Sequence, residues 1–280
     1  SLKCENIQSF MAYGAGAEAY ARGDYPTAER EFQTALAEAK AMAGAGPDAR
    51  VAQTLNNLGL VFFSQRKADD AEAAYKQALE IRQQLLESNA LGPVAPARNL
   101  GRLYREQCRW EEGQKYLELA VATSEKANSQ SELASSLNEL GLLFVKQDKF
   151  SLAEPIFERA IKITESLSGA SSLGVATLMS NLAEIKTAQG KLSEAEALYK
   201  RILEIRETGN DQAGVASTAN RLAALYRKQG KYEAAEPLLK RSLEVIEKVE
   251  PRSIDKIEAA INSLAVLYRE QGRTDDAIAL

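Results

Sequence analysis

Hydrophobic positions along the chain recur at spacings of three, four and seven residues, which is the period of an amphipathic α-helix and not the alternation of a strand. The pattern is itself repeated. A turn phrase such as Gln229-Gly230-Lys231-Tyr232 returns at intervals of 40 to 43 residues, with its second residue at positions 23, 66, 108, 148, 190, 230 and 272. We therefore predict an all-α protein in which each repeat is a pair of helices, A before the turn and B after it.

Small residues stand at constant distances before and after the second residue of each turn phrase. Seven residues before it stand Gly16, Gly59, Gly101, Gly141, Ala183, Ala223 and Ala265, and five after it stand Ala28, Ala71, Gly113, Ala153, Ala195, Ala235 and Ala277. Large residues follow four positions later: Phe32, Tyr75, Leu117, Phe157, Tyr199 and Leu239. Facing small residues let the two helices approach closely while the large residues fill the space between them. Glycine at most turns suits a left-handed helix end, so the second and third turns, which lack it, are expected to be tighter or less regular.

This order of residues resembles the tetratricopeptide repeat. The long period and phrases such as Leu55-Asn56-Asn57-Leu58-Gly59 are similar to the subtype found in kinesin light chains. The resemblance covers about residues 9–280 and implies one right-handed α-solenoid of about seven helix-turn-helix repeats. Their approximate ranges are 9–50, 51–92, 93–132, 133–174, 175–214, 215–256 and a truncated 257–280. Departures from the pattern are Gly113, Cys108 and Lys186, the last replacing the usual aromatic residue of helix A.

Composition narrows the chemistry. Apolar residues make up 45% of the chain and charged residues 26%, so it can bury a substantial core. The net charge of −4 argues against nucleic acid as the main ligand. The chain has no histidine, and its two cysteines, Cys4 and Cys108, form no CxxC pair, so we expect no catalytic residue, no metal site and no cofactor. No apolar run is long enough for a membrane span, and we expect a cytoplasmic protein, with an exported form after leader removal as the alternative.

The resemblance further implies that helix A lines the concave face. The facing positions are then three and two before the small residue of helix A, and one, four and five after it; Tyr20 and Phe63 also occupy the fourth position after. Asparagine can pair with the backbone of an extended peptide, and arginine can bind a carboxylate bidentately. We therefore predict a peptide-binding groove for an extended, acidic partner segment, formed by Asn56, Asn57, Arg98, Asn99, Arg102, Arg105, Asn138, Lys146, Asn181, Asn220, Arg221, Arg227, Asn262 and Arg269.

Other interpretations stay open. The asparagines could instead hydrogen-bond neighbouring repeats and keep the stack in register, and the arginines could be solvated surface charges. The main functional hypothesis is a protein-interaction scaffold that is not an enzyme. The alternative is a regulatory or sensor arm of a larger signalling protein with an effector domain beyond residue 280. A third is homo-oligomerisation through terminal repeats, because the truncated seventh unit is expected to expose Val266 and Leu267.

Overall fold

The computed structural model describes residues 2–44, 46–85 and 92–280, with side chains described from residue 11 onward. The described residues form helices joined by short turns and contain no strand, which confirms the predicted all-α class. The chain divides into two compact units, Ser1–Asp148 and Lys149–Leu280, and each is described by itself.

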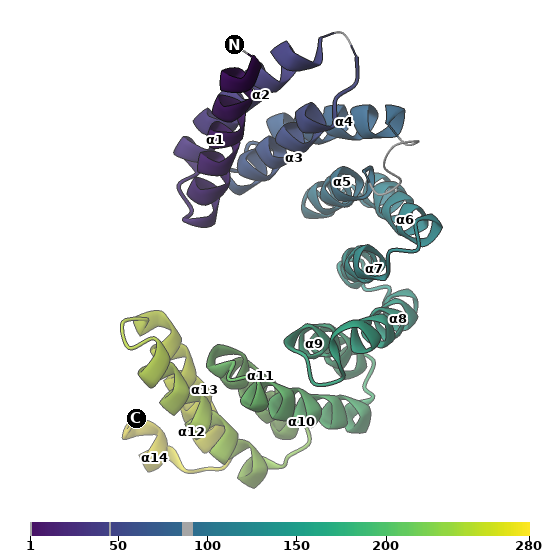
Figure 1. Cartoon of the computed structure of the whole chain (residues 1–280). Coiled ribbons are helices and arrows are strands. Elements are labelled where there is room, and N and C mark those ends of the chain that lie inside the picture. Colours follow the sequence, from purple (N-terminus) through teal and green to yellow (C-terminus); the bar gives the residue numbers. More distant parts are fainter. Residues whose placement is uncertain (1, 45, 86–91) are drawn as a thin grey trace. The chain divides into compact units, whose positions relative to one another are not determined.

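Unit 1 is the segment Ser1–Asp148. Helices α1, α3, α5 and α7 are A helices, and α2, α4 and α6 are B helices. Within the unit α1 packs on α2, α3 on α4 and α5 on α6, and each B helix also contacts the following A helix (Figure 1). The helices are α1 (Leu2–Ala21), α2 (Tyr25–Ala43), α3 (Ala49–Ser64), α4 (Ala68–Gln84), α5 (Val94–Glu106), α6 (Trp110–Lys126) and α7 (Gln130–Val145).

Unit 2 is the segment Lys149–Leu280 and repeats this plan. Helices α9, α11 and α13 are A helices, and they pack on α10, α12 and α14 respectively. Contacts of α8 with α9, α10 with α11 and α12 with α13 join successive repeats. The helices are α8 (Phe150–Ser168), α9 (Leu173–Ala188), α10 (Leu192–Thr208), α11 (Gln212–Lys228), α12 (Tyr232–Val249), α13 (Ile254–Glu270) and α14 (Thr274–Ile278).

The turns inside the repeats share one geometry. Gly23, Gly190, Gly230 and Gly272 have φ between 70° and 76°, in the left-handed region. Arg66 and Cys108 adopt the same conformation, with φ of 62° and 58°. The next backbone N–H closes the helix end in the same way in both kinds of turn, as Lys67 N to Phe62 O (2.8 Å) and Lys191 N to Lys186 O (2.9 Å) show. The expectation of less regular second and third turns is therefore wrong: the backbone keeps its shape and the non-glycine residues carry the strain.

Close approach of helices A and B depends on the small residue of helix A. A Cβ atom added to Gly59 would lie 2.4 Å from the Tyr75 ring, and one added to Gly101 would lie 2.3 Å from Leu117 Cγ. Unit 2 holds alanine at the equivalent positions, where Ala183 and Ala223 are fully buried. The pairing of small and large residues predicted from the sequence is therefore a packing contact in the hairpins α3–α4 and α5–α6.

The last repeat exposes less apolar surface than the sequence suggested. Leu267 is fully buried, so the expectation that it is exposed is wrong. Val266, on the next position of α13, is 37% exposed, and Ile278 at the end of α14 is 78% exposed. Two residues along a helix correspond to about half a turn, so Leu267 lies on the side of α13 opposite Ala265. This side faces the preceding helix, α12, which contacts α13.

A carboxylate on helix B ties most repeats to the next one, and we call this contact the inter-repeat clamp. Glu72 accepts hydrogen bonds from the Tyr104 hydroxyl (2.8 Å) and from Arg109 (2.9 Å) in the following repeat. Equivalent clamps are Glu196 with Tyr226 and Lys231, and Glu236 with Tyr268 and Arg273. The turn cation also lies over the aromatic ring, with Arg109 Cζ 4.2 Å from the Tyr104 centroid. The clamp therefore fixes the end of one A helix against the preceding B helix.

Three junctions between repeats vary the clamp. Between α2 and α3, Glu29 accepts a hydrogen bond from Lys67 (2.8 Å), but the facing aromatic residue, Phe62, has no hydroxyl. In α9 the aromatic residue is replaced by Lys186, whose buried ammonium lies 2.5 Å from Glu154 and 2.6 Å from Glu194. Between α6 and α7 the carboxylate is replaced by Gln114, which bonds Glu118 in its own helix, and the facing aromatic residue, Phe144, has no hydroxyl. The sequence departure at Lys186 is thus compensated by acids.

We expect unit 2 to be acid-sensitive because of two clamp carboxylates. A hydrogen bond from Lys186 lowers the pKa of Glu154 to about 2, and hydrogen bonds from Lys240 and Arg273 lower the pKa of Glu236 to about 2, against an ordinary value of 4.5. A depressed carboxyl pKa contributes stability above the unfolded pKa, and this stability is lost as pH falls from 4.5 towards 2. Urea unfolding followed by circular dichroism should show a loss of several kcal/mol over this window.

The control for this prediction is the double variant Glu154→Gln, Glu236→Gln. It lacks both titrating groups, so it should start less stable at pH 7 and change less with acid. An equal pH dependence in the two proteins would show that these carboxylates do not control acid unfolding.

Candidate functional site

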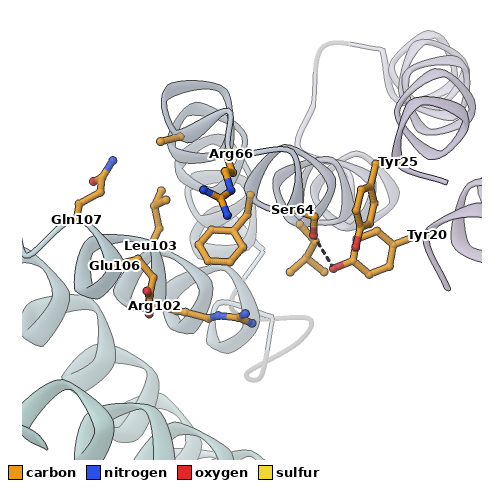
Figure 2. A pocket seen from close by; sticks show the side chains of 11 residues that line it. Tyr20, Tyr25, Ser64, Arg66, Arg102, Leu103, Glu106 and Gln107 are labelled. Atoms are coloured by element: carbon orange, nitrogen blue, oxygen red, sulfur yellow. Dashed lines mark hydrogen bonds between the residues drawn. The ribbon is translucent and has the colours of Figure 1, made fainter. Parts of the chain in front are cut away.

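A cavity of about 630 Å³ lies in unit 1 among α1, α3 and α5, at the ends of these A helices that precede the turns (Figure 2). Six of its lining residues occupy positions one, four or five after the small residue of helix A, which are positions predicted to face the groove. They are Tyr20, Leu60, Phe63, Ser64, Arg102 and Glu106, and the remaining lining residues are Tyr25, Arg66, Ala68, Leu103 and Gln107. The cavity therefore lies on the predicted face, towards its turn edge.

Aromatic side chains form much of its wall. The Tyr20 and Tyr25 rings lie 5.7 Å apart between centroids, and the Tyr20 hydroxyl is 3.2 Å from Ser64 Oγ. The Arg102 guanidinium lies 4.7 Å from the centroid of the Phe63 ring. In Figure 2, Arg66 and Arg102 lie between Glu106 and Gln107 on one side and Ser64 and Tyr20 on the other. The cavity thus combines flat apolar surfaces with hydroxyl, amide and guanidinium donors.

The cavity carries an excess of positive charge. Within the described part of the chain, neither Arg66 nor Arg102 forms an ion pair with a carboxylate. The one acid in the lining, Glu106, accepts two hydrogen bonds of 3.2 Å from Arg105. Arg105 is shared between Glu106 and Glu139, so the lining holds two guanidinium groups without an ion-pair partner beside one partly neutralised carboxylate.

Most of the other arginines predicted to bind a partner are paired within the protein. Arg98 contacts Glu132 at 2.5 Å, and Arg105, with 9% of its side chain exposed, contacts Glu139 at 2.6 Å. In unit 2, Arg221 pairs with Glu184, and Arg227 pairs with Glu270 through two hydrogen bonds. These pairs join consecutive A helices, so breaking one to bind a ligand carboxylate would exchange one ion pair for another. Lys146 and Arg269 are exposed, and no described residue forms an ion pair with either.

Along the A helices of the cavity the asparagines come before the lining residues, further from the turns. Asn99 donates to the side-chain oxygen of Asn56 (2.9 Å), and Asn57 donates to the Tyr13 hydroxyl (2.7 Å). These contacts join neighbouring repeats, as the alternative interpretation of the asparagines predicts. Asn138, Asn181 and Asn220 are half-buried and Asn262 is exposed; Asn220 Oδ1 is buried and accepts no hydrogen bond from the described residues.

Of the polar lining residues, only Arg102 belongs to the candidate set; Tyr20, Tyr25, Ser64, Arg66, Glu106 and Gln107 do not. Tyr20 was placed on the facing register but lacked the amide or charge that selected the candidates. Tyr25, Arg66 and Gln107 lie in turns or at the start of helix B, outside the helix A positions. The available signal in the sequence is a cation, Arg66, at a turn position that four other repeats fill with glycine.

The described residues show neither a metal-binding group nor a membrane span. No group of three or more cysteine, aspartate and glutamate side chains there is placed to hold a metal ion. None of the helices in that part of the chain has the length and apolarity that a bilayer span requires. Cys108 is an exposed free thiol, and the side chain of Cys4 lies outside the described residues.

Comparison with known proteins agrees with this geometry. The family model described as "Tetratricopeptide repeat" matches residues 9–84, 50–126, 93–166, 132–208 and 214–280. The protein KINESIN LIGHT CHAIN-RELATED 1 of Arabidopsis thaliana is 25% identical over 158 residues, which are 56% of this chain and 26% of the plant protein. The chain thus spans about a quarter of the length of that relative.

Several solved structures share the fold. BtubC (BKLC) from P. vanneervenii has a TM-score of 0.68 at 21% identity, covering 87% of this chain and 91% of that one. The apo form of RapI has a TM-score of 0.72 at 13% identity, covering 97% and 94%. The Rap protein complexed with competence and sporulation factor has a TM-score of 0.64 at 14% identity, covering 96% and 77%. Helical hairpins at a constant period, closed by small residues and matched by the family model over nearly the whole chain, show that this protein belongs to the tetratricopeptide repeat family and is similar to kinesin light chains.

Proposed function

We propose that this protein is an interaction scaffold, without catalytic activity, that holds an extended acidic segment of a partner protein on its helix A face. The cavity among α1, α3 and α5 is the anchoring point in unit 1, with Arg102 as its principal cation. The proposal treats the chain as one array of about seven repeats acting in the cytoplasm, without nucleic acid.

One observation carries the proposal. The cavity is lined by residues from three successive A helices at positions that the repeat register assigns to the binding face, and it holds guanidinium groups with no acidic partner among the described residues. Aromatic walls supply contact area at low entropic cost, and the guanidinium groups supply orientation for a carboxylate. The asparagines of α3 and α5 act in this proposal by holding the repeats of unit 1 in register beside the cavity.

Relatives of the same fold support this use of the surface. A Rap conjugation gene regulator, with a TM-score of 0.61 to this chain, was solved in complex with the Phr* peptide. That likeness is at 14% identity and concerns the fold, so it supports peptide binding as a class of function for this architecture and identifies no ligand.

The test compares wild type with Arg102→Ala. We expect fluorescence-labelled decapeptide pools rich in aspartate and glutamate to bind the wild-type protein with dissociation constants on the order of micromolar, and pools rich in asparagine and glutamine to bind weakly. Removing Arg102 should weaken binding of the acidic pool about tenfold, because a charge-assisted hydrogen bond is lost. Fluorescence anisotropy measures both affinities.

The matched control is Arg30→Ala, which removes one exposed arginine from α2, outside the cavity. This variant should bind the acidic pool like the wild type. Equal affinity of the wild-type protein for acidic and amide pools, or equal loss in both variants, would reject the proposed site.

A second candidate is a regulatory arm of a larger signalling protein. The fold likeness to the Rap conjugation gene regulator favours it. It predicts that peptide binding at the cavity changes the activity of a neighbouring effector domain, so the gene sequence around this chain and an activity assay of the full-length product with and without the acidic pool would test it.

A further inference from the structure

The second cation of the cavity, Arg66, stands where the repeat ordinarily has glycine. Four turns in the chain have glycine at this position, and Arg66 adopts the same left-handed conformation, with φ of 62°. A side chain disfavours that conformation because Cβ approaches the following carbonyl oxygen. The strain is stored next to the cavity, and the Arg66 side chain is one of its lining groups. Cys108 and Asp148 carry the same cost at equivalent turns outside the cavity, so what distinguishes Arg66 is the guanidinium that it adds to the lining.

Arg66 and Arg102 reach the cavity from different elements. Arg66 comes from the turn after α3, whereas Arg102 comes from the middle of α5 (Figure 2). No described carboxylate pairs with either of them, and Glu106 is engaged by Arg105. The cavity therefore presents two guanidinium groups without an ion-pair partner, beside one carboxylate that shares Arg105 with Glu139, in a protein whose net charge is −4. A single carboxylate would neutralise only one of them.

A phosphomonoester fits this charge count. At neutral pH it carries a charge of about −1.5 to −2 and three strong acceptor oxygens, and guanidinium groups bind it bidentately. The Tyr25 hydroxyl and the Gln107 amide are further donors among the lining residues. We propose that the cavity reads a phosphorylated side chain of the partner segment, with Arg66 and Arg102 sharing the phosphate. This inference rests on the proposed function and specifies which anion the site prefers.

The walls of the cavity leave room for the rest of the residue. Its volume of about 630 Å³ exceeds that of a phosphate group alone, and Tyr20, Tyr25 and Phe63 offer flat apolar surface beside the cations. Recognition of phosphorylated segments by arginine clusters is a recurrent mode of peptide binding, because the modification switches the interaction on. The scaffold would then select its partner by phosphorylation state as well as by acidic sequence.

The experiment uses decapeptide pools that share degenerate flanks and differ at one fixed central residue: serine, aspartate, phosphoserine or phosphotyrosine. We expect either phosphorylated pool to bind the wild-type protein about tenfold more tightly than the aspartate pool, by fluorescence anisotropy. Arg66→Gly should reduce the phosphorylated pools to the affinity of the aspartate pool. The same substitution relieves the turn, so it should raise Tm by about 2–4 °C, which separates loss of binding from loss of folding.

Cys108→Gly is the matched control, because Cys108 occupies the equivalent turn position with φ of 58° but does not line the cavity. It should raise Tm and leave the phosphate preference intact. Equal binding of the aspartate and phosphorylated pools would overturn the phosphate assignment and leave the proposed acidic-segment function standing. Absence of binding by all charged pools would reject both. Inorganic phosphate or phenyl phosphate that competes as strongly as the peptides would show a free-anion site and overturn recognition of a partner segment.

Discussion

Replacing Glu154 by alanine is expected to destabilise unit 2 by about 2–4 kcal/mol, because it removes the better buried partner of a buried ammonium group. Lys186 has 9% of its side chain exposed and lies 2.5 Å from Glu154, whose own side chain is 17% exposed. Lys186 would keep Glu194 at 2.6 Å, but that carboxylate is 56% exposed and partly screened by water. Unfolding followed by far-UV circular dichroism would measure the loss of stability. Hydrogen exchange of the α9 amides would show whether that loss arises in α9.

Two further variants separate burial from charge. Glu194→Ala removes the exposed partner and should cost less than about 1 kcal/mol. Lys186→Tyr restores the residue found at this position in α5, α11 and α13, where the hydroxyl bonds the clamp carboxylate, and should be tolerated better than Glu154→Ala. Equal costs for Glu154→Ala and Glu194→Ala would contradict the view that the buried pair holds α9 in place.

Adding one methyl group at Gly101 is expected to destabilise unit 1 by about 1–3 kcal/mol. The new Cβ would lie 2.3 Å from Leu117 Cγ and 3.1 Å from the Gly113 carbonyl oxygen, so α5 and α6 would have to separate. Alanine is the better helix former by about 1 kcal/mol, which offsets part of this cost. The only tryptophan, Trp110, begins α6, so its fluorescence during urea unfolding reports directly on this helical pair.

Gly14→Ala provides the matched control for this prediction. It makes the same chemical change inside α1, where an added Cβ would meet no atom within 4 Å. The helix preference then acts alone, and the free energy of unfolding should rise by up to about 1 kcal/mol. If both substitutions shifted stability in the same direction, close helix approach at Gly101 would not be the controlling factor.

The hydrogen-bond partners of the helix A asparagines could not be predicted from the sequence. The register correctly grouped Asn56, Asn57 and Asn99 on A helices, but their hydrogen bonds run along the stack to other side chains. A side-chain amide suits a peptide backbone and a neighbouring amide equally well, so composition does not distinguish the two. The spacing between repeats decides it, because it brings the amides within hydrogen-bond distance of each other.

The ion-pair partners of the helix A arginines likewise depend on the tertiary structure. Arg105 and Arg227 were selected as partner-binding cations, yet each finds a carboxylate, Glu139 or Glu270, in the adjacent A helix. These acids lie 34 and 43 residues away in sequence, so pairing depends on how consecutive A helices align. Arg102 was selected by the same rule and differs because Phe63, not an acid, faces it.

By itself the sequence determined the local structure of this protein: helical spacing, small residues in phase and a constant period specify the helices, the turns and the pairing of A with B, because these depend on neighbours along the chain. Tertiary structure alone decided which polar groups remain available. It placed the clamp glutamates against the next repeat, and it left Arg66 and Arg102 together at one cavity. Availability depends on contacts between residues of different repeats, and one-dimensional periodicity carries no distance between them.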